Sequence, residues 1–283
     1  MNAPNREIER PEPFGPGSIL WETFGDRRIL FVLGGALIMQ TMHPAIGAAV
    51  AERSVYRTDP WGRLERSLNS LQKWVYAREG GFDEGERLRA MHRSFRGTDG
   101  HGKPYWALDP EPWAWVHLTA FERGVTLEKY FTLPSQRVDD RALYKEILQL
   151  GRILQVPEDQ LPPTVEDYWA YFDEMVATTL EAHPTAVDVL ERMTETPPPK
   201  WIPPAMRAAW RPFGMSAGRF QRFITVGTFP PAIRKNFGLS WSEDDERKLR
   251  RIGGAIARVM PRLPERIRYM PIAYRARQEA RKS

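Results

Sequence analysis

Residues 29–51, ILFVLGGALIMQTMHPAIGAAVA, contain no charged side chain and are long enough to span a membrane. Gln40, Thr41, His43 and Pro44 interrupt the middle of this stretch. Proline breaks a helix interior but suits a first helical turn, so Pro44 ends one helix and opens another. The segment therefore predicts two buried core helices, and a transmembrane helix is the alternative.

Helical periodicity continues through the rest of the chain, and prolines mark the corners between helices. The expected helices cover residues 28–43, 45–53, 60–77, 82–96, 110–132, 138–155, 164–182, 184–195, 204–225, 242–260 and 264–280. Only residues 103–108 suggest a short extended piece. Because neither an internal repeat nor a long linker occurs, the sequence predicts an all-α fold, with one helical domain over 17–283 and a flexible Pro-rich segment over 1–16.

Composition restricts the choice of cofactor. None of the 283 residues is cysteine, which excludes disulfides, iron–sulfur clusters, thiolate-ligated or covalently attached haem, and Cys-rich zinc sites. A transition metal would therefore need histidine or carboxylate ligands. The chain offers five histidines: His43, His92, His101, His117 and His183.

The most informative histidine lies in RAMHRSFR, residues 89–96. In a helix, Arg89, His92 and Arg96 share one face, next to an apolar stripe. Two guanidiniums beside an imidazole on a half-buried face need an anionic partner, because an unpaired buried charge is costly. A haem fits this requirement, with its iron on His92 and its propionates on the arginines. An acidic cluster is the alternative partner, and a structural histidine is the ordinary interpretation.

Four further residues are weaker candidates. Arg63 and Ser67 lie one helical turn apart, a spacing that is also common on exposed helix faces. His43 stands at the helix break, where a hydrogen-bonded core histidine or a helix cap is the ordinary interpretation. His117 lies in an aromatic-rich helix and is expected to be a core histidine.

Signatures of other enzyme classes are missing from the sequence. A carboxylate-bridged di-iron bundle needs Glu-x-x-His, which occurs nowhere in the chain. Gly-x-Ser-x-Gly, His-Glu-x-x-His, Walker and dinucleotide-binding glycine motifs are also absent. These absences leave haem or no cofactor.

The order of motifs from about Gly25 to Tyr274 resembles the family of the latex clearing protein (a rubber oxygenase) and the MpaB-type oxygenases. The motifs are Gly25-Asp26-Arg27, His43-Pro44, DPWGRLERS at 59–67, Arg89-x-x-His92-x-x-x-Arg96, Trp115-Val-His117, Leu161-Pro162, TVGTFP at 225–230 and GLSWS at 238–242. No single motif is specific, but their order and spacing together are.

The resemblance implies a helical fold with a globin-like core, one non-covalent haem b, and oxidative cleavage of isoprenoid C=C bonds by O₂. It places the proximal haem ligand at His92 and a distal polar pair at Arg63 and Ser67. It also implies a distal carboxylate base, for which Glu52 is the nearest candidate. Some latex-cleaving members have an iron-binding lysine where this chain has Arg66, whose guanidinium stays protonated and cannot coordinate iron.

These observations predict a haem b-dependent oxygenase that acts with O₂ on a hydrophobic small molecule of isoprenoid or lipid-like character. The alternatives are a non-catalytic haem carrier or sensor, and a cofactor-free binding protein. No secretory signal or nucleic-acid-binding signature is present, so the expectation is a cytoplasmic protein without a nucleic-acid partner. Residues 247–283 contain twelve Lys or Arg against two Glu. A solvated helix face is the ordinary interpretation of this basic segment, and loose attachment to an anionic membrane surface is the alternative.

Overall fold

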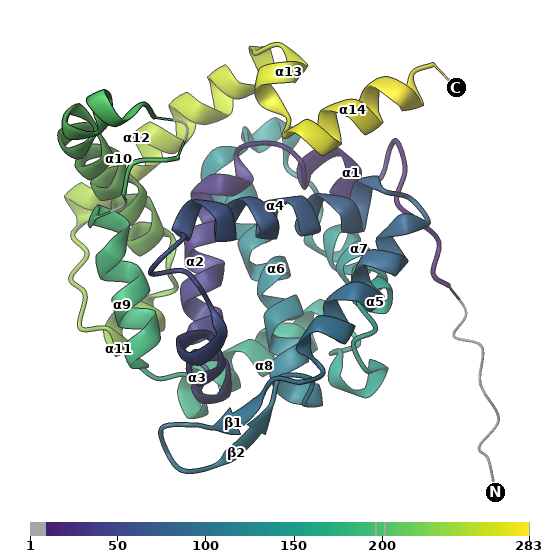
Figure 1. Ribbon diagram of the computed structural model, residues 1–283. Coiled ribbons are helices and arrows are strands. Elements are labelled where there is room, and N and C mark those ends of the chain that lie inside the picture. The colour runs from purple at the N-terminus through teal and green to yellow at the C-terminus, as the bar shows by residue number, and fades with distance from the viewer. Residues whose placement is uncertain (1–9, 196, 201, 283) are drawn as a thin grey trace, which may run out of the picture.

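The computed structural model of the protein describes residues 10–195, 197–200 and 202–282, and these residues are almost entirely helical (Figure 1). The α-helices are α1 (Ile19–Thr23), α2 (Ile29–Thr41), α3 (Pro44–Arg53), α4 (Pro60–Tyr76), α5 (Gly80–His92), α6 (Pro110–Phe131), α7 (Asp140–Ile153), α8 (Val165–Thr178), α9 (Pro184–Arg192), α10 (Arg207–Thr228), α11 (Pro231–Asn236), α12 (Glu243–Val259), α13 (Glu265–Arg268) and α14 (Pro271–Ala280). Five single 3₁₀ turns supplement them: η1 (Pro134–Gln136), η2 (Glu158–Gln160), η3 (Met193–Glu195), η4 (Pro204–Met206) and η5 (Met260–Arg262). Strands β1 (Arg96–Thr98) and β2 (Pro104–Trp106) form a small antiparallel hairpin. The predicted all-α class is confirmed.

The apolar stretch at residues 29–51 forms two helices, as its interruption predicts. His43 is the N-cap residue of α3 and Pro44 occupies the first turn, so the chain bends by 104° between α2 and α3. Within the described residues no single helix is long and apolar enough to cross a membrane, although the bent pair passes that test by length and composition together. Most of α2 is buried among its neighbours, which is the environment expected of a core helix.

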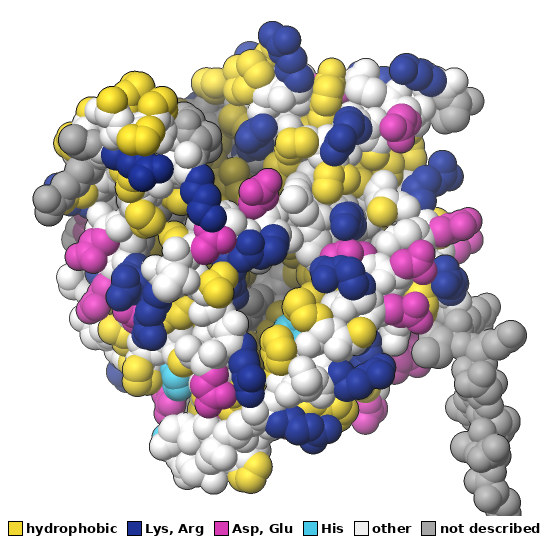
Figure 2. All heavy atoms as spheres, in the orientation of Figure 1, with side chains coloured by type: hydrophobic (Ala, Val, Ile, Leu, Met, Phe, Trp, Pro, Cys, Tyr) yellow, Lys and Arg dark blue, Asp and Glu magenta, His cyan; other side chains and the backbone are white. Residues whose placement is uncertain are grey.

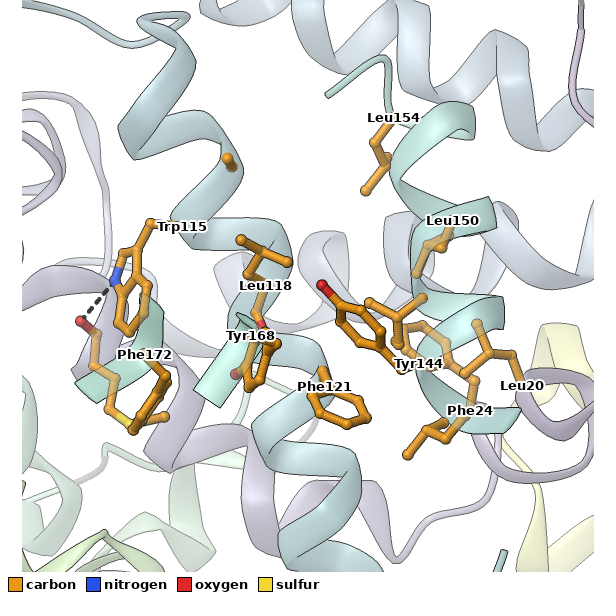
Figure 3. Close-up of a cluster of buried hydrophobic side chains, with 14 of the residues drawn as sticks. Leu20, Phe24, Trp115, Leu118, Phe121, Tyr144, Leu150, Leu154, Tyr168 and Phe172 are labelled. Atoms are coloured by element: carbon orange, nitrogen blue, oxygen red, sulfur yellow. Dashed lines mark hydrogen bonds between the residues drawn. The ribbon is translucent and has the colours of Figure 1, made fainter. Parts of the chain in front are cut away.

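Helix α6 forms the centre of the core and packs against α2, α7 and α12. Its buried face carries Trp115, Leu118 and Phe121, all fully enclosed. The ring of Phe121 lies edge-on to Tyr144 of α7 and to Tyr168 of α8, with centroid distances of 4.7 Å to each (Figure 3). Edge-to-face aromatic pairs of this kind add about 0.5–1.5 kcal/mol beyond the burial of apolar area. The aromatic side chains of α6, α7 and α8 therefore fix the helices behind the candidate site.

The two ends of the fold are joined through Asp26. The backbone at Gly25 and Arg27 pairs with the extended residues 268–270 in an isolated antiparallel bridge. Asp26 is fully buried, and its carboxylate accepts hydrogen bonds from Arg28 at 2.9 and 3.0 Å and from Arg268 at 2.7 Å. A side chain at Gly25 would collide with Tyr76 and Ala273, so glycine is needed at this approach. The Gly25-Asp26-Arg27 motif is thus structural.

Three sequence expectations need correction. Helix α5 ends at His92 instead of residue 96, because Arg96 pairs with Trp106 in the hairpin. The helix expected over 264–280 is divided into α13 and α14, since residues 268–270 join the bridge to Asp26 and Pro271 starts a new helix. The short helices α1 and α11 were not predicted.

The Pro-rich N-terminal segment lies partly outside the described residues, which begin at residue 10. Phe14 is buried, and Gln149 of α7 donates a hydrogen bond to the carbonyl of Glu12 at 2.7 Å. Arg10 forms an exposed ion pair with Asp83 at 3.2 Å. Residues 10–14 therefore pack along α5 and α7.

Candidate functional site

A hollow lies in the middle of one face of the molecule, with hydrophobic side chains and a histidine in its wall and Lys and Arg side chains around it (Figure 2). In Figure 1 helix α4 crosses in front of α2 and α6. The α4–α5 hairpin packs mainly on itself, on α7 and, through α4, on α1 and α14.

Helices around the hollow carry apolar side chains that stay partly exposed instead of joining the packed core. Val116 of the central helix α6 is 37% exposed. Other half-buried apolar side chains are Leu33 and Leu37 on α2, Leu64 and Leu68 on α4, and Leu88 on α5. Partly exposed leucines on helices that otherwise face the core are typical of the walls of an apolar ligand pocket.

His92 is the last residue of α5, and its imidazole is held in one tautomer. Its Nδ1–H donates to the carbonyl of Leu88 at 2.8 Å, and a carbonyl oxygen can only accept. The ring lies edge-on to Phe95 and Trp113, at centroid distances of 5.1 and 5.5 Å. Burial lowers the pKa of His92 below its usual value. Its Nε2 therefore carries a lone pair at neutral pH, and it has no hydrogen-bond partner among the described residues.

The arginines expected beside His92 separate in the structure. Arg89 is half-buried, donates to the carbonyl of Gln155 at 3.1 Å and lies 5.7 Å from the ring centroid of Trp113. It has no carboxylate partner within the described part of the chain, and burial lowers its pKa. Arg96 is exposed in β1, where its guanidinium lies over the ring of Trp106 at 4.5 Å. Arg89 thus remains near His92 on α5, whereas Arg96 has left that helix face.

Arg63 and Ser67 lie one turn apart on α4, as predicted. The Nε–H of Arg63 donates to the hydroxyl of Ser54, and burial, followed by the nearby charge of Arg66, lowers the pKa of Arg63. Neither a carboxylate for Arg63 nor a hydrogen bond for the Ser67 hydroxyl is found among residues 10–195, 197–200 and 202–282. Arg66 points outward, 3.4 Å from Asp59. The α4 face that carries Arg63 and Ser67 therefore offers unused hydrogen-bond donors.

The end of α3 connects these residues on α4 and α5. Ser54, which follows α3, accepts from Arg63 of α4, while the guanidinium of Arg53 lies 5.9 Å from the ring centroid of Phe95. Phe95 in turn contacts His92. The structure therefore brings Arg63 and His92 to one region through Ser54, Arg53 and Phe95.

Glu52 lies in the last turn of α3, next to Arg53, and its side chain contacts the β1–β2 hairpin. It accepts a hydrogen bond from the Tyr105 hydroxyl of β2 at 3.2 Å and lies 3.9 Å from Arg53. Its side chain is 46% exposed. These contacts direct Glu52 toward the hairpin, and its role as a catalytic base stays a prediction.

His43 is buried and bound to α6. Its Nε2 lies 3.3 Å from Glu111, and the hydrogen bond from His43 lowers the pKa of that carboxyl group. Its Nδ1 is buried without a partner in the described residues. Glu111 and Trp113 both belong to the first turn of α6, so His43 and His92 contact the same end of that helix.

His117 lies between α6 and α7, with its ring edge against Gly151 and both ring nitrogens buried without a hydrogen-bond partner among the described residues. Burial lowers the pKa of His117 to about 4. In the unfolded chain the pKa is about 6.5, so the unfolded state binds the proton first as pH falls. The stability that neutral His117 contributes is present above pH 6.5 and is lost between pH 6.5 and about 4.

Between pH 7 and pH 4, the free energy of unfolding should fall by about 3 kcal/mol less in His117→Gln than in the wild type. The reason is that each unit of pKa shift is worth about 1.4 kcal/mol. The measurement is the free energy of unfolding in urea at pH 7 and at pH 4. The control His101→Gln changes an exposed histidine paired with Glu181 and should retain the wild-type acid loss. An equal acid loss in wild type and His117→Gln would contradict the burial of a neutral imidazole.

Within the described residues, no group of three or more His, Asp or Glu side chains is placed to hold a metal ion. A porphyrin brings four nitrogen ligands of its own, so a haem iron needs only one imidazole from the protein. The oriented and unpaired Nε2 of His92 is therefore compatible with a haem iron.

Sequence reasoning did not identify three contributors to the site. Ser54 orients Arg63, Glu111 orients His43, and the carbonyl of Leu88 orients His92. Leu88 lies four residues before His92 on one helix, and this spacing could have predicted the contact between its carbonyl and the imidazole. The contacts of Ser54 and Glu111 join different helices, so no local pattern indicates them.

The fold and the site define an all-helical protein with an apolar, histidine-bearing hollow. Residues 21–258 match the model of the family described as ER-bound oxygenase mpaB/B′/rubber oxygenase, catalytic domain. The chain belongs to this family, and it is an oxygenase-type enzyme.

Two curated relatives, from Mycobacterium bovis and Mycobacterium tuberculosis, are described as uncharacterised proteins. Each is 26% identical to this chain over 217 residues, which cover 75% of this chain and 81% of the relative. No solved structure matches the chain.

Proposed function

We propose that the protein is a haem b-dependent oxygenase that acts with O₂ on a hydrophobic substrate of isoprenoid or lipid-like character. One observation carries the proposal: within the described residues, the Nε2 of His92 is unprotonated and has no hydrogen-bond partner, on a helix that also carries the half-buried Leu88. Membership of an oxygenase family supports the reaction class. The globin-like arrangement implied by the resemblance is part of this proposal.

The residues present fit a haem. A ligating histidine almost always donates its other ring N–H to a carbonyl or carboxylate, which fixes the ring and raises its basicity. Leu88 serves His92 in this way. Half-buried Arg89 and Arg63 have no carboxylate partner in the described residues, and propionates or other anions would satisfy them. His92 would hold the iron and Arg89 a propionate.

When bound, the haem would supply the dioxygen chemistry. The protein supplies position and polarity. Leu88 keeps His92 in the required tautomer, and burial keeps the imidazole neutral at pH 7. Arg63 and Ser67 offer a charged and a neutral donor to negative charge that develops on oxygen. The half-buried leucines of α2, α4 and α5 would exclude water and hold an alkene chain.

Cleavage of an alkene by O₂ balances without an external reductant, because the two oxygen atoms end in two carbonyl groups. The test is oxygen uptake by the haem-loaded protein with polyprenyl alcohols of increasing length, together with detection of carbonyl products. Uptake with carbonyl formation is the expected result. Stoichiometric haem without uptake for any such substrate would indicate a haem carrier or sensor and contradict the oxygenase proposal.

Replacement of Arg63 should weaken anion binding without loss of haem. A charged hydrogen bond contributes about 1.5–3 kcal/mol, so Arg63→Ala should raise the Kd of the ferric protein for azide or cyanide about ten- to a hundredfold. Ser67→Ala should have a smaller effect because its hydroxyl is a neutral donor. The control Arg66→Ala removes an exposed arginine of the same helix and should retain wild-type affinity. If Arg63→Ala also retains it, Arg63 is a structural residue.

A further inference from the structure

Helix α10 and its N-cap residue, Met206, carry a row of exposed apolar side chains. Met206 is 60% exposed, Phe213 65% and Phe220 41%. These residues are spaced by seven, which places them along one face of the helix with a drift of only about 20° per step. We call Met206, Phe213 and Phe220 the α10 stripe. Hydrophobic side chains gather at the tip of the molecule formed by α10, at the upper left of Figure 2.

The rest of α10 is anchored to the protein, so the stripe is held outward. Gly214 and Gly218 are buried, and a side chain at Gly218 would collide with the backbone of Met193. The ring of Trp210 lies 6.4 Å from that of Trp61 at the start of α4. Because packing fixes the inner side of α10, the exposure of the stripe is a property of the folded protein.

The segment of sequence that contains the stripe carries charges of a single sign. From residue 196 to residue 242 the sequence has seven Lys or Arg and neither Asp nor Glu, over 47 residues. Arg207 and Arg219 are exposed on α10, and neither forms an ion pair among the described residues. Exposed apolar side chains next to exposed, unpaired arginines on one helix are the pattern of a helix that lies in an anionic membrane interface.

We propose that the α10 stripe docks on an anionic lipid bilayer, with Phe213 and Met206 entering the boundary between headgroups and acyl chains and Arg207 and Arg219 binding lipid phosphates. Charge complementarity favours this occupant. A second copy of the same stripe would bring its own arginines against these and be repelled. A nucleic acid would match the arginines but leave the exposed phenylalanines in water.

The α10 stripe lies close to the start of α4, the helix that carries Arg63. Trp61, which contacts Trp210, lies two residues before Arg63 on α4. Lys200, which precedes α10, pairs with Asp59 at the N-cap of α4 at 3.1 Å. A bilayer held by α10 would therefore lie near the end of α4 that borders the hollow. The docking itself goes beyond the proposed oxygenase function and requires no haem.

Sedimentation of the full chain with vesicles tests the proposal. Vesicles of phosphatidylcholine with phosphatidylserine should bind the protein, whereas vesicles of phosphatidylcholine alone should bind it much more weakly. Phe213→Ser should lower the partition coefficient about tenfold or more, as expected for loss of one inserted aromatic side chain. The matched control Val55→Ser changes an exposed apolar residue outside α10 and should bind as wild type.

A second measurement reports insertion directly. The chain has no cysteine, so Phe213→Cys creates a single site for an environment-sensitive fluorophore. The label should shift to shorter wavelength with anionic vesicles. A label at Gly100→Cys, in the open turn between β1 and β2, should not shift.

Two results would overturn the proposal. One is wild-type vesicle binding by Phe213→Ser together with loss of binding by Arg258→Glu combined with Arg262→Glu, because the basic C-terminal segment would then be the attachment site. The other is no vesicle binding by the wild-type protein while Phe213→Ser changes its oligomeric state, because the stripe would then be an interface between copies.

Discussion

His92→Ala should lose haem while its far-ultraviolet circular dichroism stays that of the wild type. His92 supplies an oriented imidazole nitrogen that has no hydrogen-bond partner among the described residues, and its ring is half-buried at the end of α5. We expect the Kd for haem to rise by at least about a hundredfold, equivalent to about 2.7 kcal/mol. Titration with haemin, followed by the Soret band, measures this change.

Two controls make the His92 result specific. His43→Ala removes an imidazole that contacts the same end of α6 but is bound to Glu111, and it should retain haem. His92→Gly with added imidazole should recover part of the Soret band, because the free ligand can occupy the vacated position. Full haem retention by His92→Ala would make the assignment wrong and turn attention to His43, whose Nδ1 is buried without a partner in the described part of the chain.

The second large effect is expected from Asp26→Ala. The substitution leaves the guanidiniums of Arg28 and Arg268 without their carboxylate, in positions where their side chains are only 7% and 23% exposed. Removal of one partner from a buried ion pair costs about 3–5 kcal/mol, because a charge stays buried and uncompensated. Urea denaturation should show this loss as a lower midpoint with an unchanged slope.

Glu22→Gln is the control for Asp26→Ala. Glu22 pairs with Arg277 at 2.8 Å, but its side chain is 45% exposed, so the loss should stay below about 1 kcal/mol. Equal stabilities for the two variants would show that Asp26 does not fasten the N-terminal segment to the C-terminal helices.

The sequence predicted those parts of the fold that local chemistry determines. The break at His43-Pro44 follows from the conformational preference of proline, and α6 follows from a long amphipathic pattern that starts at a proline. Helix α1 has a local signal in its N-cap residue Ser18, whose hydroxyl accepts from the N–H of Trp21, but the helix was not predicted from it. Its first two backbone N–H groups also donate to Glu146 of α7 at 2.7 Å each, so a residue far away in the sequence completes the cap.

At the end of α5, too, a tertiary contact determines the structure and the local sequence pattern does not predict it. Apolar and basic residues continue the helical pattern to Arg96, but Gly97 passes close to the ring of Tyr105 and residues 96–98 pair with β2. This tertiary pairing overrides the local preference and removes Arg96 from the His92 face. His92 became a candidate because spacing within one helix indicates which residues share a face, whereas Arg63 and Ser67 became candidates through the family resemblance, and the roles of all three stay predictions. The contacts of Ser54 and Glu111 depend on the packing of separate helices.

Haemin titration of the wild-type full-length chain tests the central claim most directly. The account predicts a saturable Soret band at one haem per chain, with a haem b spectrum in alkaline pyridine. It also predicts complete extraction into acidic organic solvent, because the chain has no cysteine to tether the haem. A correctly folded, helical protein that shows no saturable haem binding in this titration would contradict the account.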